Sequence, residues 1–257
     1  MLKIPPNTID IWLTDERQIT DPGVLDTYAG FLSQDEARRH QRFVFNQHQH
    51  QFLVARALVR SVLAQYVGEV DPAAVAFQLT DLGKPELTND VGLQFNLSHT
   101  PGLIALAVMK KHPLGIDVEH LSRQSDIVRL ADRYFSRLEY QGLKALPVSE
   151  WNNRFYDLWT LKEAYLKACG TGLRTPLDAF SFRLEDKRIG IEFTPHLADD
   201  PQTWHFRQLA VEGGFRLSLA VKAEDVGPYT LVVRRGCPLQ PFAKIEQQVV
   251  RSSASIH

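Results

Sequence analysis

The sequence contains only two cysteines, Cys169 and Cys237, among its 257 residues. Neither has zinc-ligand spacing around it, and two cysteines cannot build a disulfide framework, so the chain fits a reducing compartment. No apolar stretch long enough for a signal peptide precedes Asp10, and no run approaches the roughly 18 apolar residues of a membrane span. We therefore expect a cytoplasmic protein without a membrane partner.

The sequence also lacks an excess of charge. It holds 29 Lys and Arg against 30 Asp and Glu, for a formal net charge of -1. Proteins that bind nucleic-acid backbones usually carry a large basic excess, so we expect no nucleic-acid partner, and any bound anion must be met by a local group of cations. With 44% hydrophobic residues, the chain is long enough for one large domain or two of roughly 110–130 residues each.

Helix signals open the chain. Asp21-Pro22 places a capping residue before proline at the first helical position and predicts a helix to about Phe31. Ser33 and Glu36 form a capping box for a short second helix. A longer amphipathic helix is predicted from about Gln47 to Tyr66. Its apolar face is formed by Phe52, Ala55, Val59, Val62 and Tyr66, with Arg56 and Arg60 off that face.

Three strands are predicted after these helices. Apolar and polar residues alternate from Leu93 to Leu97 and again from Leu114 to Val118, as in half-buried strands. Between them, Leu103 to Met109 is a continuous apolar run, and Lys110–Pro113 forms a turn.

The second half repeats this plan. Ser136 and Glu139 form another capping box, and a helix is predicted from about Glu150 to Cys169, ended by Gly170. Two echoes support a duplicated unit: Ser33 and Phe52 recur 103 residues later as Ser136 and Phe155, and Ala105–Val108 resembles Ser218–Val221. We predict an α+β fold of two pseudo-symmetric halves, each with helices packed on a small, mostly antiparallel sheet. The expected bounds are 1–112 and 113–235, followed by a polar tail, 236–257, that should be frayed from Leu239 onward.

Two pairs of charged residues are candidates for chemistry. Asp117 and Glu119, two apart on a strand, point to one face, where a hard divalent cation would offset their repulsion. Glu163 and Lys167, four apart on a helix, could add a third carboxylate and a cation that meets a phosphate. Each pair also has an ordinary alternative. The acids could be solvated at a strand end, and the helix pair could be an exposed contact worth roughly 0.2–0.5 kcal/mol.

Two polar segments of the first half are candidates for holding an anion. The hydroxyl, imidazole and backbone groups of Asn96–Thr100 could bind a phosphate, although loop polarity alone also explains them. No GxSxG elbow surrounds Ser98, which disfavours a hydrolase nucleophile. Asp81–Pro85 is typical of a turn. Lys84 and Arg56 are candidates for binding an anion only if other groups that contact an anion lie near them.

The residue patterns of these segments, and their order along the chain, resemble those of the 4′-phosphopantetheinyl transferases. Gly115-Ile116-Asp117-Val118-Glu119 is similar to the family's strand motif, and Trp159-Thr160-Leu161-Lys162-Glu163-Ala164-Tyr165-Leu166-Lys167 is similar to its helix motif. Gly83-Lys84-Pro85 and Phe95-Asn96-Leu97-Ser98-His99 match two further family elements in the right order. The duplicated length indicates the surfactin-synthetase-activating type.

The resemblance implies a site. Asp117, Glu119 and Glu163 are then the Mg²⁺ ligands (Mn²⁺ as a substitute), and Glu163 is also the base for a serine hydroxyl, directly or through a metal-bound water. Lys167 contacts the pyrophosphate of coenzyme A and protonates the leaving group. The remaining coenzyme A contacts are Arg56, Gly83, Lys84, Pro85, Asn96, Ser98 and His99. Glu36 interrupts the basic residues that some relatives carry, so Arg38 and Arg39 are not assigned to coenzyme A.

The resemblance also implies a reaction and partners. The phosphopantetheine of coenzyme A is transferred to a serine of an apo acyl, peptidyl or polyketide carrier protein, and adenosine 3′,5′-bisphosphate leaves. The site is expected at the seam of the two halves of a monomer, with carriers docking on 120–146, where cations mix with apolar side chains. The alternative is an amphipathic helical segment whose apolar side, with Tyr134, Phe135 and Leu138, covers the sheet of the second half. Two alternatives are a non-catalytic carrier-binding homologue and an unrelated Mg²⁺-dependent phosphotransferase. The three intact carboxylates disfavour the first, and the absence of a GxxxxGK[ST] loop disfavours the second.

Overall fold

The computed structural model describes residues 1–69, 71–89, 92–123, 125–224 and 229–253. The chain divides into two compact units: Met1–Lys111 with Thr230–Ile245, and His112–Tyr229 with Glu246–His257. The first unit therefore takes in Thr230–Ile245, which the sequence analysis divided between the second half and the tail. Both units combine helices with a mostly antiparallel sheet, which confirms the predicted α+β class.

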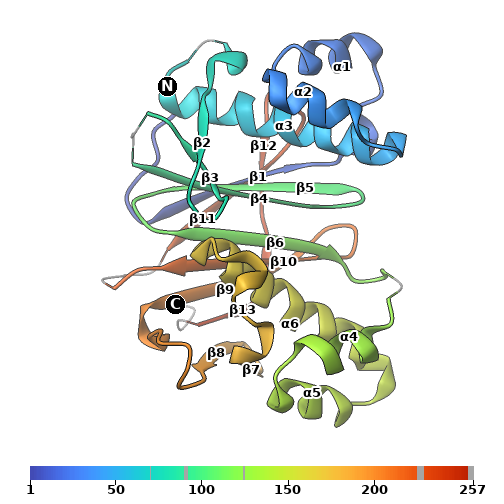
Figure 1. Ribbon diagram of the computed structural model, residues 1–257, viewed down its shortest axis with the longest axis vertical. Coiled ribbons are helices and arrows are strands. Elements are labelled where there is room, and N and C mark those ends of the chain that lie inside the picture. Colours follow the sequence, from blue (N-terminus) through green and yellow to red (C-terminus); the bar gives the residue numbers. More distant parts are fainter. Residues whose placement is uncertain (70, 90–91, 124, 225–228, 254–257) are drawn as a thin grey trace. The chain divides into compact units, whose positions relative to one another are not determined.

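The first unit is a five-stranded sheet with its helices on one face (Figure 1). The strand order is β12-β11-β1-β5-β4, and β2 and β3 form a separate hairpin. Its elements are β1 (Thr8–Thr14), α1 (Pro22–Ala29), α2 (Gln34–Gln41), α3 (Asn46–Val67), β2 (Phe77–Leu79), β3 (Pro85–Leu87), β4 (Leu93–Thr100), β5 (Leu103–Lys110), β11 (Thr230–Arg235) and β12 (Ala243–Ile245).

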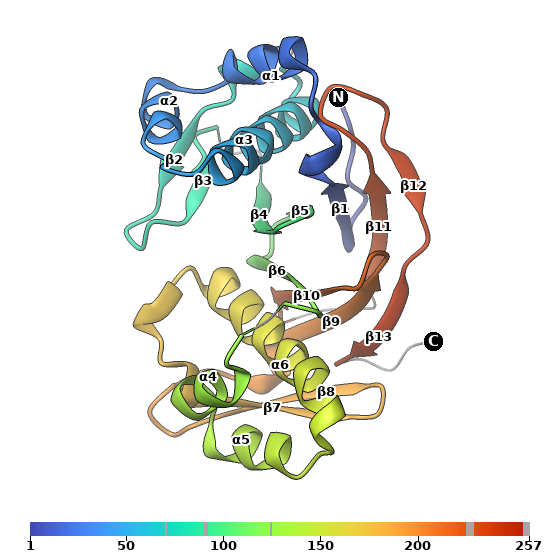
Figure 2. The ribbon, with the colours of Figure 1, turned by 90° about the vertical axis from the view of Figure 1, so that its right-hand side faces the viewer.

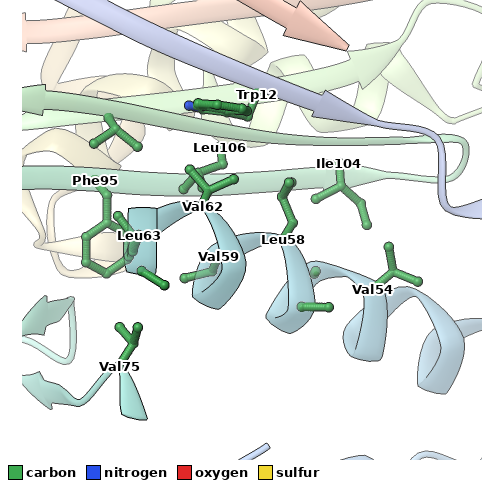
Figure 3. Close-up of a cluster of buried hydrophobic side chains, with 14 of the residues drawn as sticks. Trp12, Val54, Leu58, Val59, Val62, Leu63, Val75, Phe95, Ile104 and Leu106 are labelled. Atoms are coloured by element: carbon green, nitrogen blue, oxygen red, sulfur yellow. The ribbon is translucent and has the colours of Figure 1, made fainter. Parts of the chain in front are cut away.

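Apolar side chains form a core between α3 and this sheet (Figure 3). Leu58 and Val62 of α3 lie over Ile104 and Leu106 of β5, and all four side chains are fully buried. Trp12 of β1 packs in the same cluster. Burial of such side chains stabilises the folded state by roughly 1.5–3 kcal/mol each, so this interface contributes strongly to the stability of the first unit.

The second unit has a six-stranded sheet in the order β6-β10-β9-β13-β8-β7, with α6 lying against it (Figure 2). Aromatic rings dominate its core, for example Tyr165 against Phe180, with ring centroids 4.5 Å apart. Its elements are β6 (Leu114–His120), α4 (Ile127–Tyr134), α5 (Arg137–Lys144), α6 (Val148–Cys169), β7 (Phe180–Glu185), β8 (Arg188–Phe193), β9 (Trp204–Val211), β10 (Phe215–Lys222) and β13 (Gln248–Ser252).

The predicted helix starts are confirmed. Asp21 accepts a hydrogen bond from the N–H of Val24 at the start of α1. Ser33 and Glu36 form a complete capping box on α2, as Ser136 and Glu139 do on α5. These signals were readable because a cap involves residues only three apart. None of the described helices is long and apolar enough to cross a bilayer.

The duplication is confirmed by topology, but one of its sequence echoes is wrong by one residue. β1, β5 and β4 are neighbours in the same antiparallel order as β6, β10 and β9. Leu106 packs under α3, and Ser218 is the β10 residue that bonds to α6. Aligning the two eight-residue strands, β5 from Leu103 and β10 from Phe215, also makes Leu106 correspond to Ser218. The echo had aligned Leu106 with Leu219, and a shift of one residue exchanges the faces of a strand.

The expectation of a frayed tail is also wrong for the described residues. Ala243–Ile245 pairs with β11, and Gln248–Ser252 pairs with β9 and β8. Residues 254–257 lie outside the described part of the chain. The composition of the tail is polar, but strand pairing depends on distant partners that a local pattern does not reveal.

Candidate active site

The two strand acids face α6. Asp117 and Glu119 of β6 pair in register with Ser218 and Arg216 of β10. Ser218 hydrogen-bonds Thr160 of α6 at 2.8 Å, so this face of the sheet is the one that α6 covers. Asp117 is only 6% exposed and is not the solvated strand-end acid of the ordinary alternative.

Gly115 lets α6 lie directly on the backbone of β6. A Cβ at Gly115 would come within 1.9 Å of the carbonyl oxygen of Ala164 and 2.5 Å of the nitrogen of Ala168. Any side chain would therefore push the helix away, which explains the glycine at the start of the strand motif. The close approach brings Glu163 and Lys167 of α6 beside the strand acids.

Cations already hold two of the three carboxylates. The Lys167 Nζ lies 2.7 Å from Asp117 Oδ1, and the Arg123 Nη1 lies 2.9 Å from Glu119 Oε1. Burial raises the pKa of the Glu163 carboxyl, and the nearby Asp117 and Glu119 raise it further, while Lys167 partly opposes the shift. Glu163 thus shares an electrostatic environment with both strand acids.

The donor chemistry fits a hard divalent cation. Three carboxylates supply the oxygen ligands that Mg²⁺ prefers, and the raised pKa of Glu163 reflects negative charge that a cation would offset. Within the described ranges, no three acidic, histidine or cysteine side chains are already gathered as a metal-ligand group. Lys167 and Arg123 would have to release their partners, which their 28% and 54% exposed side chains allow.

Sequence reasoning missed the role of Lys162, the neighbour of Glu163 in the helix motif. The Lys162 side chain is fully buried, and its Nζ donates to the carbonyls of Leu177 and Phe180, each at 2.7 Å. It also pairs with Glu139 at 2.8 Å. The motif therefore serves two purposes, because Lys162 anchors α6 within the fold while Glu163 faces the acids of β6.

In the first unit, Arg56 is paired with an acid. Its Nε lies 2.9 Å from Glu36 Oε1, and its guanidinium lies over the ring of Phe77. Glu36 also binds Arg60 at 2.7 Å. Burial lowers the pKa of Arg56, and Glu36 opposes that shift. The glutamate that interrupts the basic residues of α2 is therefore the partner of the arginine assigned to a phosphate.

The predicted turn at Gly83-Lys84-Pro85 joins β2 to β3. Gly83 has a φ of +84°, where glycine is favoured, and its N–H donates to the carbonyl of Thr80 at 2.8 Å. The N–H of Lys84 donates to Thr80 Oγ1 at 3.0 Å. Phe77, at the open end of the same hairpin, packs against Phe95 of β4, with ring centroids 5.6 Å apart, so the hairpin is held against β4 at the end opposite the turn.

Asn96, Ser98 and His99 lie on β4, the last strand in the order of its sheet. Phe95 packs in the cluster under α3, so alternation places His99 on that face and Asn96 and Ser98 on the other. Ser98 is 5% exposed, whereas His99 is exposed. Within the first unit, Arg56 contacts Phe77 of the hairpin, which in turn packs on β4, and within the second unit Lys167 pairs with Asp117. That the two groups meet at one seam stays a prediction.

The structure separates the two alternatives for the apolar residues of 120–146. Phe135 and Leu143 are 4% and 1% exposed, and Phe135 stacks on Phe155, so both belong to the core and cannot contact a partner. Tyr134 is half-buried against Trp159. Leu138 is 48% exposed. The cations of the segment are all exposed: Arg123, Arg129, Arg133, Arg137 and Lys144.

Comparison with known proteins decides the family. Residues 113–220 match the 4′-phosphopantetheinyl transferase superfamily, and residues 22–111 match the N-terminal region of a 4′-phosphopantetheinyl transferase. The chain belongs to the 4′-phosphopantetheinyl transferase family. It is a transferase, and the family transfers phosphopantetheine to carrier proteins.

Two relatives illustrate the match. The chain is 42% identical over 201 residues to the 4′-phosphopantetheinyl transferase HetI of Nostoc sp., covering 77% of this chain and 81% of the relative. It is 30% identical over 201 residues to the transferase Sfp of Bacillus subtilis, covering 78% and 86%. A holo-(acyl-carrier-protein) synthase from Bacillus anthracis, solved with CoA (3′,5′-ADP), aligns at 20% identity with a TM-score of 0.37, over 44% of this chain and 96% of that one.

Proposed function

We propose that this transferase uses coenzyme A as donor and a serine of an apo carrier protein as acceptor, depends on Mg²⁺ (Mn²⁺ as a substitute), and releases adenosine 3′,5′-bisphosphate. The observation that carries the proposal is the close approach of α6 to β6 at Gly115, which puts Glu163 and Lys167 beside Asp117. Three acids and one lysine on one buried face suit a metal and a diphosphate together.

Asp117, Glu119 and Glu163 would hold the ion. When bound, Mg²⁺ supplies positive charge that offsets the charge developing on the phosphate oxygens. Lys167 turns from Asp117 to the pyrophosphate, and Arg123 releases Glu119. Both side chains are long and partly exposed, so these exchanges need no change of the backbone.

Glu163 is the proposed base. It acts directly or through a metal-bound water, since a serine hydroxyl is a poor nucleophile at neutral pH without a positioned proton acceptor. The serine oxygen forms a bond to the β-phosphorus of coenzyme A while the bond from that phosphorus to the leaving phosphate oxygen breaks. Glu163 takes the hydroxyl proton, and Lys167 donates a proton to the leaving adenosine 3′,5′-bisphosphate.

The first unit is proposed to bind the nucleotide of coenzyme A. Arg56 and His99 would read the 3′-phosphate, and Asn96 and Ser98 would lie along the pyrophosphate. The Gly83-Lys84-Pro85 turn would lie along the adenine. Arg56 keeps several guanidinium donors beyond the Nε that faces Glu36, so it can meet a phosphate without leaving its partner.

The carrier is proposed to dock on the exposed cations of 120–146 and on Leu138, because carriers of this class are acidic helical proteins. Charge complementarity of this kind raises the rate of encounter. A substitution that reverses the charge at Arg129 should raise the KM for the carrier and leave the KM for coenzyme A unchanged. We further propose a cytoplasmic monomer with no nucleic-acid partner.

The mass of an apo carrier protein tests the function. Incubation with coenzyme A and Mg²⁺ should add one phosphopantetheine, and EDTA should prevent the addition. Glu163→Gln should abolish transfer, whereas Glu150→Gln, which removes the same charge from an exposed position on the same helix, should not. Carrier binding without a mass change would favour the non-catalytic alternative, and phosphate transfer from ATP would favour an unrelated phosphotransferase.

A further inference from the structure

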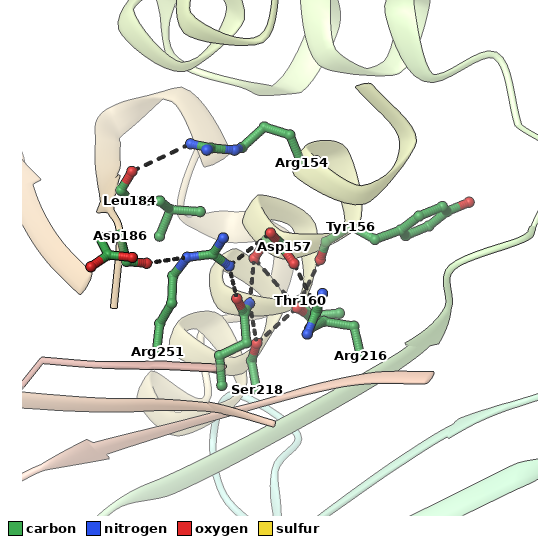
Figure 4. A network of polar contacts seen from close by, with 10 residues as sticks. Arg154, Tyr156, Asp157, Thr160, Leu184, Asp186, Arg216, Ser218 and Arg251 are labelled. Atoms are coloured by element: carbon green, nitrogen blue, oxygen red, sulfur yellow. Dashed lines mark hydrogen bonds and ion pairs between the residues drawn. The ribbon is translucent and has the colours of Figure 1, made fainter. Parts of the chain in front are cut away.

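A buried acid on α6 holds two arginines from two different strands. Asp157 is 3% exposed, and its Oδ1 lies 2.6 Å from the Nε of Arg216 on β10 (Figure 4). Its Oδ2 accepts a hydrogen bond from the Nη1 of Arg251 on β13 at 2.8 Å. A carboxylate buried at this depth needs such partners, because an unpaired buried charge is costly.

Neutral side chains complete this network beneath α6. Gln208 of β9 donates to the backbone carbonyl of Asp157 at 3.0 Å and to Ser218 Oγ at 3.1 Å, and it accepts from Arg251 at 2.8 Å. Ser218 in turn bonds Thr160. The network therefore fixes one stretch of α6 against three strands, six residues before Glu163.

Arg216 is the cation of this network that lies nearest the metal ligands. It pairs in register with Glu119, and cross-strand partners point to the same face of a sheet. Opposite charges in such positions attract each other. In the described part of the chain, however, the ion pair of Arg216 is with Asp157, and Glu119 is met by Arg123.

We propose that Asp157 is a positioning residue of the metal site, which holds Arg216 away from Glu119. This inference rests on the proposed function. Without the Asp157 charge, Arg216 would turn to Glu119, and a divalent ion would have to displace two guanidinium groups from that carboxylate instead of one.

Arg251 supplies the matched control. It shares the same carboxylate, but it comes from β13 and also binds the carbonyl of Asp186 at 3.0 Å, on the far side from Glu119. Arg251→Met removes one ion pair from Asp157 and leaves Arg216 in place. A purely structural role of Asp157 predicts that loss of either arginine weakens metal binding in proportion to the loss of stability.

Direct binding of Mn²⁺ in the presence of coenzyme A, followed by electron paramagnetic resonance, tests the proposal together with the Tm of each variant. Asp157→Asn should weaken binding about 10- to 100-fold, the range typical for loss of a residue that supports metal ligands. The double variant Asp157→Asn/Arg216→Met should recover most of the affinity, because the competing cation is gone. Arg251→Met should bind within about threefold of the wild type, well short of the tenfold that losing a ligand-supporting partner costs.

Two results would overturn the proposal: wild-type affinity in Asp157→Asn, or no recovery in the double variant. If Asp157→Asn does not fold, Arg216→Met alone decides, since Asp157 keeps Arg251; it should bind Mn²⁺ at least as tightly as the wild type, and weaker binding contradicts the proposal. Absence of Mn²⁺ binding by the wild type would instead contradict the metal site of the proposed function.

Discussion

The two units place a 22-residue helix over the same arrangement of three strands, but the sheet surface under the helix differs in its chemistry. Under α3 the core is mainly apolar, as Figure 3 shows, with a polar contact between Asp10 and Tyr66. Under α6 the corresponding surface contains a polar network and the candidate metal ligands, as Figure 4 shows in part. Matching the strand registers aligns three cross-strand pairs of the first unit with three of the second. These are Trp12–Leu106 with Asp117–Ser218, Thr14–Ile104 with Glu119–Arg216, and Asp10–Val108 with Gly115–Ala220.

The pair Asp10–Val108 and its counterpart Gly115–Ala220 differ in how closely they let the helix approach the strand. In the first unit, Asp10 accepts a hydrogen bond from the hydroxyl of Tyr66 of α3 at 2.5 Å and pairs with Arg234 at 2.6 Å, so a side chain separates helix from strand. In the second unit, Gly115 has no side chain, and α6 contacts the strand backbone. The same arrangement of strands thus carries a buried tyrosine contact in one copy and a direct helix–strand contact beside the candidate metal ligands in the other.

The largest effect on stability is expected from the anchor of α6. Lys162→Met should cost about 3–5 kcal/mol in urea unfolding, because it leaves the carboxylate of Glu139 buried without a cation. Arg60→Met, which removes a corresponding partner of Glu36 in the first unit, should cost less, since Glu36 keeps Arg56. Arg183→Met, in a half-exposed pair, should cost about 0–1 kcal/mol. Equal losses in all three variants would show that burial of the ion pair does not determine the cost of removing its cation.

Gly115→Ala should remove the direct contact of α6 with β6, which the first unit lacks. The new methyl group overlaps the backbone of α6, so the helix must move, at a cost of about 1–3 kcal/mol in unfolding free energy, and transfer should be lost. Gly142→Ala is the matched control, because a Cβ there has open space within α5; it should be neutral or stabilising by up to about 1 kcal/mol. Wild-type transfer by Gly115→Ala would contradict the close approach.

Arg56→Ala tests whether the first unit binds the nucleotide of coenzyme A. An arginine–phosphate contact contributes about 1.5–3 kcal/mol, so the preference for coenzyme A over dephospho-coenzyme A should fall by about tenfold or more in kcat/KM. Arg38→Ala removes an exposed cation of α2 and should leave the preference unchanged. Unchanged discrimination in Arg56→Ala would identify that residue as a structural partner of Glu36 alone.

The smallest effect is a pH dependence of stability. Because the pKa of Glu163 is raised in the folded state, its contribution to stability is complete below the ordinary value of about 4.3 and is lost as the pH rises through the raised value. Metal-free Glu163→Gln should therefore have a higher Tm than the wild type at neutral pH, and the difference should shrink toward pH 4. A difference that is independent of pH would argue against the raised pKa.

Local features of this molecule were predictable from its sequence. The capping boxes at Ser33 and Ser136 and the C-terminal Gly170 of α6 depend on neighbours in the chain, and the structure has all three. The motifs also brought Asp117, Glu163 and Lys167 to one face, since strand and helix periods fix which residues share a side.

Features that depend on distant partners were not predictable. The tail gains its structure by pairing with β9 and β11. The pairing of Arg56 with Glu36 and the burial of Lys162 arise from helix packing, which no periodicity reports. Arg216 and Asp157 carried no motif, and only the strand register shows that Arg216 lies across from Glu119.

Mn²⁺ binding in the presence of coenzyme A tests most directly whether the metal site lies on the second unit. The wild type should bind one ion per chain, and Asp117→Asn should weaken binding by at least about tenfold, as expected when a metal ligand or its close support is lost. Asp10→Asn, a like change on the corresponding strand of the first unit, should keep the wild-type affinity. Unchanged binding in Asp117→Asn, or an equal loss in both variants, would contradict the division of roles between the two units.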